Sequence, residues 1–244
     1  MTVSKAALLL LPNLLGETKH HELFLPPSVD RAVASLDGLI AESESGGRRF
    51  LSHFKTAKPP HQIPLAVLTA HPNSEEVDFY LEPLTKGERW GLIADAGLPC
   101  IADPGAELVR RARQMGIPIQ AFIGPSSILL SLMLSGLPGQ HFRFCGYIAR
   151  TPEQRRKELL ALQKVSREEK ATQIFIEAPY RNQATLDTLL EALADETWLC
   201  VAWDLTLPTQ GLVSQPIANW RKIPRPAIHK KPAIFLVYSE PFPL

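Results

Sequence analysis

Cysteine is scarce in this sequence of 244 residues, and the few cysteines present lie far apart. Cys100, Cys145 and Cys200 form no pair of closely spaced thiolates, and no histidine spacing completes a zinc site. We therefore interpret all three as small buried hydrophobic side chains of a protein in a reducing compartment. The pattern predicts no metal site.

Long hydrophobic runs and an excess of one charge are also missing. The run at residues 6–11 is far too short to span a bilayer, and Lys5 is the only charged residue before it, so it predicts a first strand. The 26 Lys and Arg against 25 Asp and Glu give a net charge of +1, which argues against a global basic field for nucleic acid. A net charge near zero is still compatible with a local basic surface. We expect a cytoplasmic protein that does not contact a membrane.

The glycine spacings of nucleotide-binding loops are missing as well. Gly16 stands alone in the loop 12–16, which ends the predicted strand 6–12. Neither the dinucleotide fingerprint nor the phosphate-binding P-loop occurs anywhere in the chain. This argues against nicotinamide and nucleoside-triphosphate chemistry, and the loop itself is a candidate wall of a ligand site.

The first half of the chain does contain a regular alternation of apolar strands and amphipathic helices. The predicted strands cover residues 6–12, 38–42, 65–69, 90–94 and 117–123. The predicted helices cover residues 28–36, the end of 43–54, 75–84, 104–115 and 128–135. Their expected N-caps are Ser28, Asn73 or Ser74, and Asp103. Such an order predicts a parallel sheet covered by helices.

A second α/β domain is predicted from residue 139 onward. Residues 136–140 look like a linker, and the strands expected after it cover residues 142–148, 172–177, 198–203 and 233–238. Helices are expected from residue 152 to about 164 and over 182–194, and a loop through Gly211 is expected ahead of a short segment at 217–220. The fold class is therefore α/β, with domains at 1–138 and 139–244.

Acidic residues stand at the ends of three predicted strands: Glu42, Asp95 and Glu177. Asp95 is followed by turns at Gly97 and at 103–105, and it stands where open α/β sheets bind ligands. The alternative is that Asp95 only accepts hydrogen bonds from turn amides, as Asp often does. We expect Glu42 and Asp95 to share one edge of the sheet.

A second candidate site lies at Ser126 and Ser127, where a Gly-Pro turn leads into a helix. Unpaired amides and hydroxyl groups at a helix N-terminus bind a carboxylate or a ribose hydroxyl well, although a plain helix cap is an equal alternative. Two basic groups, Arg48 with Arg49 and residues 155–157, are compatible with anionic contacts. A solvated helix face is the favoured interpretation of both groups.

Three stretches carry a resemblance to a known family, in order along the chain. Residues 94–105 contain ADAGLP and ADPG, residues 123–127 read IGPSS, and residues 175–181 read FIEAPYR. With them the sequence resembles the tetrapyrrole methylase family, the class III methyltransferases that depend on S-adenosyl-L-methionine. The likeness extends over most of the chain. It is strongest to the members that methylate a cytidine ribose of 16S ribosomal RNA.

This resemblance implies two α/β domains with the cofactor in a cleft between them, S-adenosyl-L-methionine as the methyl donor, and a homodimer. It implies ribosomal RNA or the small ribosomal subunit as the partner. Carried over by position, the family's cofactor contacts fall on Pro12, Asp95, Leu98, Ser126, Ser127, Ile176 or Glu177, Ala202 and Pro232.

The expected reaction is an in-line transfer of a methyl group to an acceptor oxygen, with no metal required. Glu42 is the candidate group to take the acceptor's proton, and its alternative is a hydrogen bond to a neighbouring loop. Residues 12–16 and 41–45 differ from those of the family's RNA-modifying members. Two other functions therefore stay open: methylation of a tetrapyrrole-like small molecule, and cofactor binding without catalysis.

Overall fold

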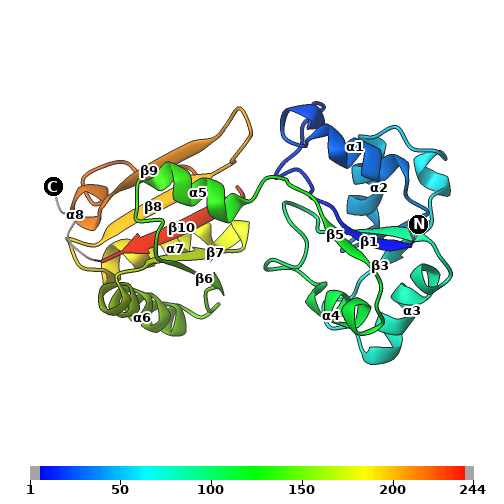
Figure 1. The fold of residues 1–244 in the computed structure, drawn as a ribbon. Coiled ribbons are helices and arrows are strands. Elements are labelled where there is room, and N and C mark those ends of the chain that lie inside the picture. The colour runs from blue at the N-terminus through cyan, green and yellow to red at the C-terminus, as the bar shows by residue number, and fades with distance from the viewer. Residues whose placement is uncertain (1–5, 240–244) are drawn as a thin grey trace. The chain divides into compact units, whose positions relative to one another are not determined.

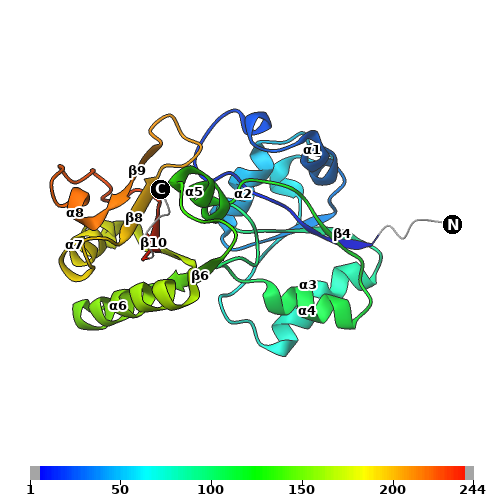
Figure 2. The same ribbon diagram turned by 60° about the vertical axis from the view of Figure 1, so that its left-hand side comes forward.

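The computed structural model describes residues 6–239, which divide into two compact units (Figures 1 and 2). The first unit ends at Ser126 and the second begins at Ser127. The sequence pattern places this division after residue 138. Helix α5 (Ser127–Ser135) accounts for the difference, because it packs on the sheet of the second unit.

The first unit is built on a parallel sheet of five strands (Figure 1). Its strands run in the order β3 (Leu65–Val67), β2 (Gly38–Ala41), β4 (Arg89–Ile93), β1 (Ala7–Leu10) and β5 (Ile119–Ala121). Every neighbouring pair is parallel, so the predicted parallel sheet is confirmed. The three central strands are buried on both faces, which is why they read as nearly continuous apolar runs.

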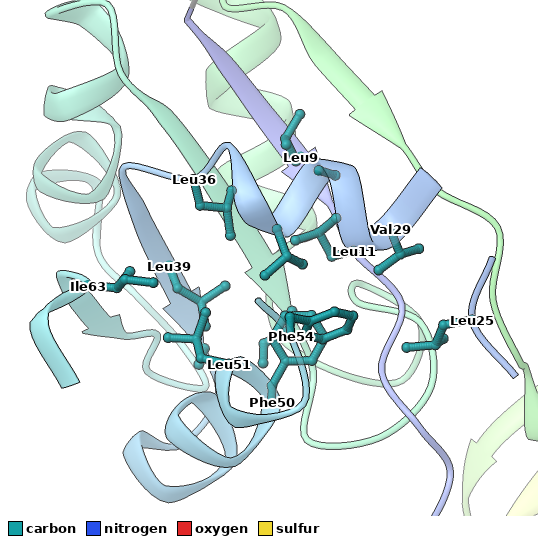
Figure 3. Packing of buried hydrophobic residues seen from close by; sticks show 14 of the residues in the cluster. Leu9, Leu11, Leu25, Val29, Leu36, Leu39, Phe50, Leu51, Phe54 and Ile63 are labelled. Carbon is teal, nitrogen blue, oxygen red and sulfur yellow. The ribbon is translucent and has the colours of Figure 1, made fainter. Parts of the chain in front are cut away.

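Helices cover both faces of this sheet. Those on one face are α1 (Pro27–Ala34) and α2 (Glu44–Ser52), and those on the other are α3 (Ser74–Thr85) and α4 (Ala106–Gln114). Figure 3 shows the first of these layers, where Phe50 and Leu51 of α2 pack toward Leu39 of β2. The connecting loops contain two short 3-10 helices, η1 (His21–Leu23) and η2 (Pro60–Gln62).

Two of the predicted helix caps are wrong. Asn73 caps α3 as expected and forms a complete capping box. Ser28 is not a cap, because α1 already begins at Pro27. Asp103 is not a cap either, because Gly105 precedes α4 with a φ of 129°, which favours glycine and delays the start of the helix.

The second unit contains a mixed sheet of five strands. They run in the order β6 (Phe142–Tyr147), β7 (Thr172–Ile176), β10 (Ala233–Tyr238), β8 (Trp198–Trp203) and β9 (Gly211–Pro216). β6 and β7 are parallel, whereas the other neighbouring pairs are antiparallel. The sequence pattern misses β9, a half-buried edge strand that ends in proline, a residue confined to such edges.

Helices cover this second sheet unevenly. Those on one face are α6 (Pro152–Glu169), α7 (Asn182–Ala192) and α8 (Ile217–Trp220), while α5 packs on the other face. A 3-10 turn, η3 (Pro179–Arg181), leads into α7. α6 runs past its predicted end and stops at Lys170, whose φ of 51° is left-handed. Among residues 6–239, no helix combines the length and the apolarity that a membrane crossing needs.

Candidate functional site

Glu42 and Asp95 meet at the carboxyl edge of the first sheet, as expected for residues that follow parallel strands. The Asp95 N–H donates to Glu42 Oε2 over 3.1 Å. The Ser43 hydroxyl donates to Asp95 Oδ1 over 2.7 Å, and Ser43 also caps α2 by accepting the Gly46 N–H. Each acid therefore has a fixed place, and the predicted shared edge is confirmed.

Asn13, the third residue beyond β1, fixes the turn that carries Asp95. Its side-chain amide donates to the carbonyls of Ala94 and Asp95, each over 3.0 Å, and its backbone N–H donates to Gly97 over 2.7 Å. Sequence reasoning missed this role. The available signal was an asparagine after a buried apolar strand, because a buried amide must find partners.

The Asp95 carboxylate is exposed at this edge. Among the described residues, the Ser43 hydroxyl donates a hydrogen bond to it, and the amides of its own turn do not. A Cβ placed on Gly46 would overlap Asp95 Oδ1, so the carboxylate depends on a glycine at that point of α2. The side chain is therefore oriented but still accessible to a ligand that donates hydrogen bonds.

A third carboxyl group, Asp103, experiences the charge of the other two. Burial raises the pKa of Asp103 to about 6, and repulsion from Glu42 and Asp95 adds to the increase. The edge therefore carries a concentration of negative charge, which favours a ligand with a positive centre.

Asp103→Asn is expected to stabilise the protein at pH 7.5 by about 1 to 2 kcal/mol, a value reduced for partial exposure. Because the pKa in the folded state is raised above the ordinary 3.8, ionisation of Asp103 costs stability as the pH rises through 3.8 toward 6. The gain should be complete above about pH 7 and absent below about pH 3.5. Urea unfolding at both pH values measures it, and an equal gain at both would contradict the explanation. Glu107→Gln, at an exposed surface pair, is the control.

The other candidate residues of the first unit lie in loops that follow its strands. Pro12 is buried, and Gly124 approaches it so closely that a Cβ on Gly124 would overlap the proline ring. Leu98 and Ser126 are half-buried. The loop after Leu98 also contains Cys100 with a φ of 67°, a left-handed value that is rare outside glycine and is often found at functional sites.

In the second unit, the register of the strands aligns Ile176, Ala202 and Ile234. Ile234 of β10 pairs with Ile176 of β7 on one side and with Ala202 of β8 on the other. Paired residues point to the same face of a sheet, here the face that α5 covers. Ile128, in the first turn of α5, packs against the same cluster, and Ser127 precedes it as the first residue of that helix.

Pro232 and Glu177 flank that row. The Pro232 carbonyl accepts the Asp204 N–H over 3.1 Å, and the Asp204 carboxylate pairs with Lys231 over 2.9 Å. Glu177 is buried, and its carboxylate accepts the Thr185 hydroxyl over 3.0 Å.

The Glu177 carboxylate also accepts its neighbour's amide and pairs with Arg181. With these donors it fixes the turn that leads into α7, so its side chain has a structural role. A cofactor contact through its backbone stays a prediction.

The arginines of the two basic groups have different surroundings. Arg48 Nη1 donates to the carbonyls of Pro60 and Ile63, each over 2.8 Å. Arg155 is buried, and its Nε donates to the Thr188 hydroxyl over 3.2 Å. These two side chains hold the fold together, which the solvated helix face favoured from the sequence did not predict. Arg49, Arg156 and Lys157 are exposed, as that interpretation predicts.

Comparison with known proteins gives consistent matches. The sequence profile of the Tetrapyrrole (Corrin/Porphyrin) Methylases matches residues 25–220. The chain is 36% identical to Ribosomal RNA small subunit methyltransferase I of Bacillus subtilis over 189 residues, which cover 77% of this chain and 61% of the relative. The protein of the same name from Vibrio cholerae is 31% identical over 187 residues, 77% of this chain and 62% of the relative. The chain thus spans about three fifths of the length of these relatives.

Solved structures match over nearly the whole chain. The methyltransferase CobJ has a TM-score of 0.63 and 15% identity, over 96% of this chain and 93% of CobJ. Diphthine synthase has a TM-score of 0.64 and 13% identity, over 96% of this chain and 89% of the synthase. At these identities the likeness shows a shared fold, and it confirms the predicted α/β fold class.

Proposed function

Because the chain belongs to the tetrapyrrole methylase family, we propose that it transfers a methyl group from S-adenosyl-L-methionine to a ribose 2′-hydroxyl of 16S ribosomal RNA. The observation that carries this proposal is the 31% and 36% identity to proteins named Ribosomal RNA small subunit methyltransferase I. S-adenosyl-L-methionine is the methyl donor of the family.

The acidic edge of the first unit fits this donor. When bound, the donor supplies an electrophilic methyl group on a sulfonium sulfur, and it carries an ammonium group and a ribose diol. The exposed Asp95 carboxylate can accept hydrogen bonds from either the ammonium group or the diol. Glu42 and Asp103 add negative charge, which favours a cationic ligand.

The second unit supplies a different kind of surface. Ile176, Ala202 and Ile234 form an apolar row, in which Ala202 and Ile234 are buried and Ile176 is half-buried, so Ile176 is the member that can contact an apolar face of the nucleoside. Ser127 stands at the start of α5, where backbone N–H groups and a hydroxyl are available to polar atoms. The other proposed contacts of the donor are Pro12, Leu98 and Ser126 in the first unit and Pro232 in the second.

The transfer forms a bond from the acceptor oxygen to the methyl carbon while the bond from carbon to sulfur breaks. The proton of the 2′-hydroxyl must leave, and Glu42 is the proposed group that takes it. Glu42 Oε2 accepts the Asp95 N–H, which fixes the carboxylate at the edge, and Oε1 is the oxygen proposed to take the proton. The remaining contribution is alignment of the reacting atoms.

Glu42→Gln is expected to lower kcat about 100-fold if the carboxylate takes the proton. The amide oxygen of glutamine can still accept the Asp95 N–H, so KM for the methyl donor should change little. Single-turnover kinetics with labelled donor measure the effect. Glu42→Ala removes both roles and shows how much of the rate depends on positioning alone. Unchanged turnover in Glu42→Gln would eliminate Glu42 as the base.

Ribose methylation of 16S ribosomal RNA in cells with and without the gene tests the proposed function. Loss of one 2′-O-methyl group on deletion, restored by the wild type but not by an Asp95 variant, would support it. Donor binding without any change in ribosomal RNA would favour a binding protein or a small-molecule methyltransferase. Mass spectrometry of nuclease digests locates the missing methyl group.

We infer further that the chain forms a homodimer and acts in the cytoplasm, where its proposed substrate is assembled. Helix α5 exposes Leu129, Met133 and Leu134, whose relative exposures are 48%, 77% and 47%. Apolar side chains grouped on one helix mark a surface for protein contact. Sedimentation equilibrium tests the dimer.

A further inference from the structure

A cavity of about 580 Å³ opens in the first unit beside Asp95. The loop that follows β1, helix α2 and the turn that follows β4 form its wall. Its volume lies in the range of about 300 to 1,000 Å³ that small-molecule sites occupy. Apart from Asp95, the proposed reaction gives these lining residues no contact with the substrate.

Cationic side chains line this cavity. Lys19 is exposed, and the side chain of Arg49 is 53% exposed. Arg49 pairs with Glu17 over 3.3 Å, and the Glu17 side chain is 85% exposed. Such a surface pair contributes only about 0 to 1 kcal/mol, so an anionic ligand can replace Glu17 at small cost.

His53 adds an imidazole to the same wall. Partial burial lowers the pKa of His53, and the nearby His21 and Arg49 lower it further. The other charged groups that line the cavity are Glu17, Lys19 and Asp95. A bound anion would reverse the effect of the neighbouring cations, so His53 is poised to take up a proton when an anion binds.

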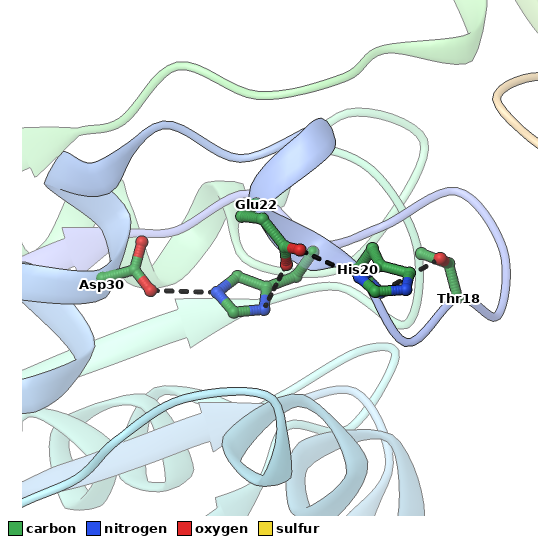
Figure 4. Close-up of polar contacts among 5 residues, drawn as sticks. Thr18, His20, Glu22 and Asp30 are labelled. Carbon is green, nitrogen blue, oxygen red and sulfur yellow. Dashed lines mark hydrogen bonds and ion pairs between the residues drawn. The ribbon is translucent and has the colours of Figure 1, made fainter.

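The wall of the cavity is anchored by His21. Its Nε2 lies 2.9 Å from Asp30 Oδ1, and its Nδ1 lies 3.7 Å from Glu22 Oε2. Asp30 and Glu22, the two partners of this ring, are labelled in Figure 4. The ring also packs edge-on against Phe54, with centroids 4.6 Å apart. These contacts tie the loop after β1 to α1 and to the segment that follows α2, so the cavity is part of the fold of this unit.

From this cavity we infer a binding site for the phosphodiester backbone of the acceptor RNA, an inference that rests on the proposed function. Lys19 and Arg49 pair with phosphate oxygens, since arginine and lysine are the usual partners of phosphate groups. Leu15, a half-buried residue of the lining, offers an apolar surface to the sugar. Inorganic phosphate has the same oxygens but no sugar, which separates the two ligands.

Binding of a cytidine dinucleotide with one phosphodiester tests this site, measured by calorimetry on the full chain saturated with S-adenosyl-L-homocysteine. Lys19→Gln and Arg49→Gln should each weaken binding about fivefold, and the double variant about 25-fold. Both side chains are exposed, so the variants should fold. Lys55→Gln and Arg113→Gln change exposed cations outside the cavity and should keep the wild-type affinity.

The dependence of binding on pH supplies a second measurement. The charge of a phosphodiester is constant between pH 7.5 and 6, so a rise in affinity on acidification reports proton uptake by the protein. Asp103 also takes up a proton in this range, so both proteins compared carry Asp103→Asn. We expect a rise of about two- to threefold with His53 present and none when His53→Ala is added.

The outcomes separate this inference from the proposed function. Equal affinity for inorganic phosphate and the dinucleotide would overturn the backbone site, as would unchanged affinity in the double variant. If the double variant methylates 16S ribosomal RNA with an unchanged KM for small subunits, the site is refuted and the function stands. If it loses dinucleotide binding while the wild type methylates no ribosomal RNA, the cavity binds a phosphodiester and the proposed function fails.

Discussion

Replacing Asp95 by alanine is expected to weaken the binding of S-adenosyl-L-methionine about 100-fold, which corresponds to about 3 kcal/mol. The carboxylate is the exposed acceptor at the sheet edge, and its removal leaves the donors of the ligand without a charged partner. The fold should change little, because Asn13 and Glu42 hold the backbone of the turn without using this side chain. Calorimetry with the methyl donor measures the affinity.

Two further variants locate the effect in the carboxylate. Glu107→Ala removes an exposed carboxylate on α4 and should leave the affinity unchanged. Gly46→Ala keeps the Asp95 carboxylate but puts a methyl group where its Oδ1 lies and against the capping Ser43 hydroxyl, so it should also reduce the affinity. Wild-type affinity in Asp95→Ala would refute this residue as a donor contact.

Replacing Glu177 by alanine is expected to lower the free energy of unfolding by about 3 to 5 kcal/mol. The carboxylate is fully buried, and it forms an ion pair with Arg181, whose side chain is 13% exposed. Nε and Nη1 of Arg181 are already buried without a hydrogen-bond partner among the described residues. Without Glu177, a buried cation would lack a counter-charge. Urea unfolding followed by tryptophan fluorescence measures the loss.

A surface ion pair provides the matched control for Glu177. Glu196→Ala breaks the ion pair with Arg167, in which the side chains of Glu196 and Arg167 are 58% and 54% exposed. This variant should lower the free energy of unfolding by at most about 1 kcal/mol. Substituting methionine at both Glu177 and Arg181 should recover part of the loss, because no unpaired charge then remains buried. If Glu177→Ala lowers the free energy of unfolding no more than the control does, Glu177 and Arg181 do not form a buried ion pair.

The fold was largely predictable because each element of the first unit has a strong local signal. The buried strands are apolar runs, and the alternation with helices leaves a parallel sheet as the natural arrangement. The missing strand, β9, has mixed polarity and ends in proline, so its pairing with β8 depends on tertiary contacts. The start of α4 depends on the φ of Gly105, a conformation that sequence alone does not reveal.

The candidate site was predictable only where chemistry coincides with a strand end. Asp95 and Glu42 follow adjacent strands, and their hydrogen bond confirms the expected shared edge. The cavity lined by Lys19, Arg49 and His53 has no such signal. The residues that line the cavity come from a loop and a helix that are far apart in sequence. The alternation of hydrophobic and polar residues does not predict that these two segments come into contact. The resemblance of the chain to its family supplied the remaining candidates.

The position of β10 has a consequence for synthesis of the chain. This strand comes last in sequence among those of the second sheet but lies between β7 and β8. All strands of the first sheet precede residue 122, so that sheet can assemble while the ribosome still holds the nascent chain. The row of Ile176, Ala202 and Ile234 cannot close until residues 233–238 leave the exit tunnel. Until then β7 and β8 present unpaired edges, so a chain interrupted before this strand would be prone to aggregate.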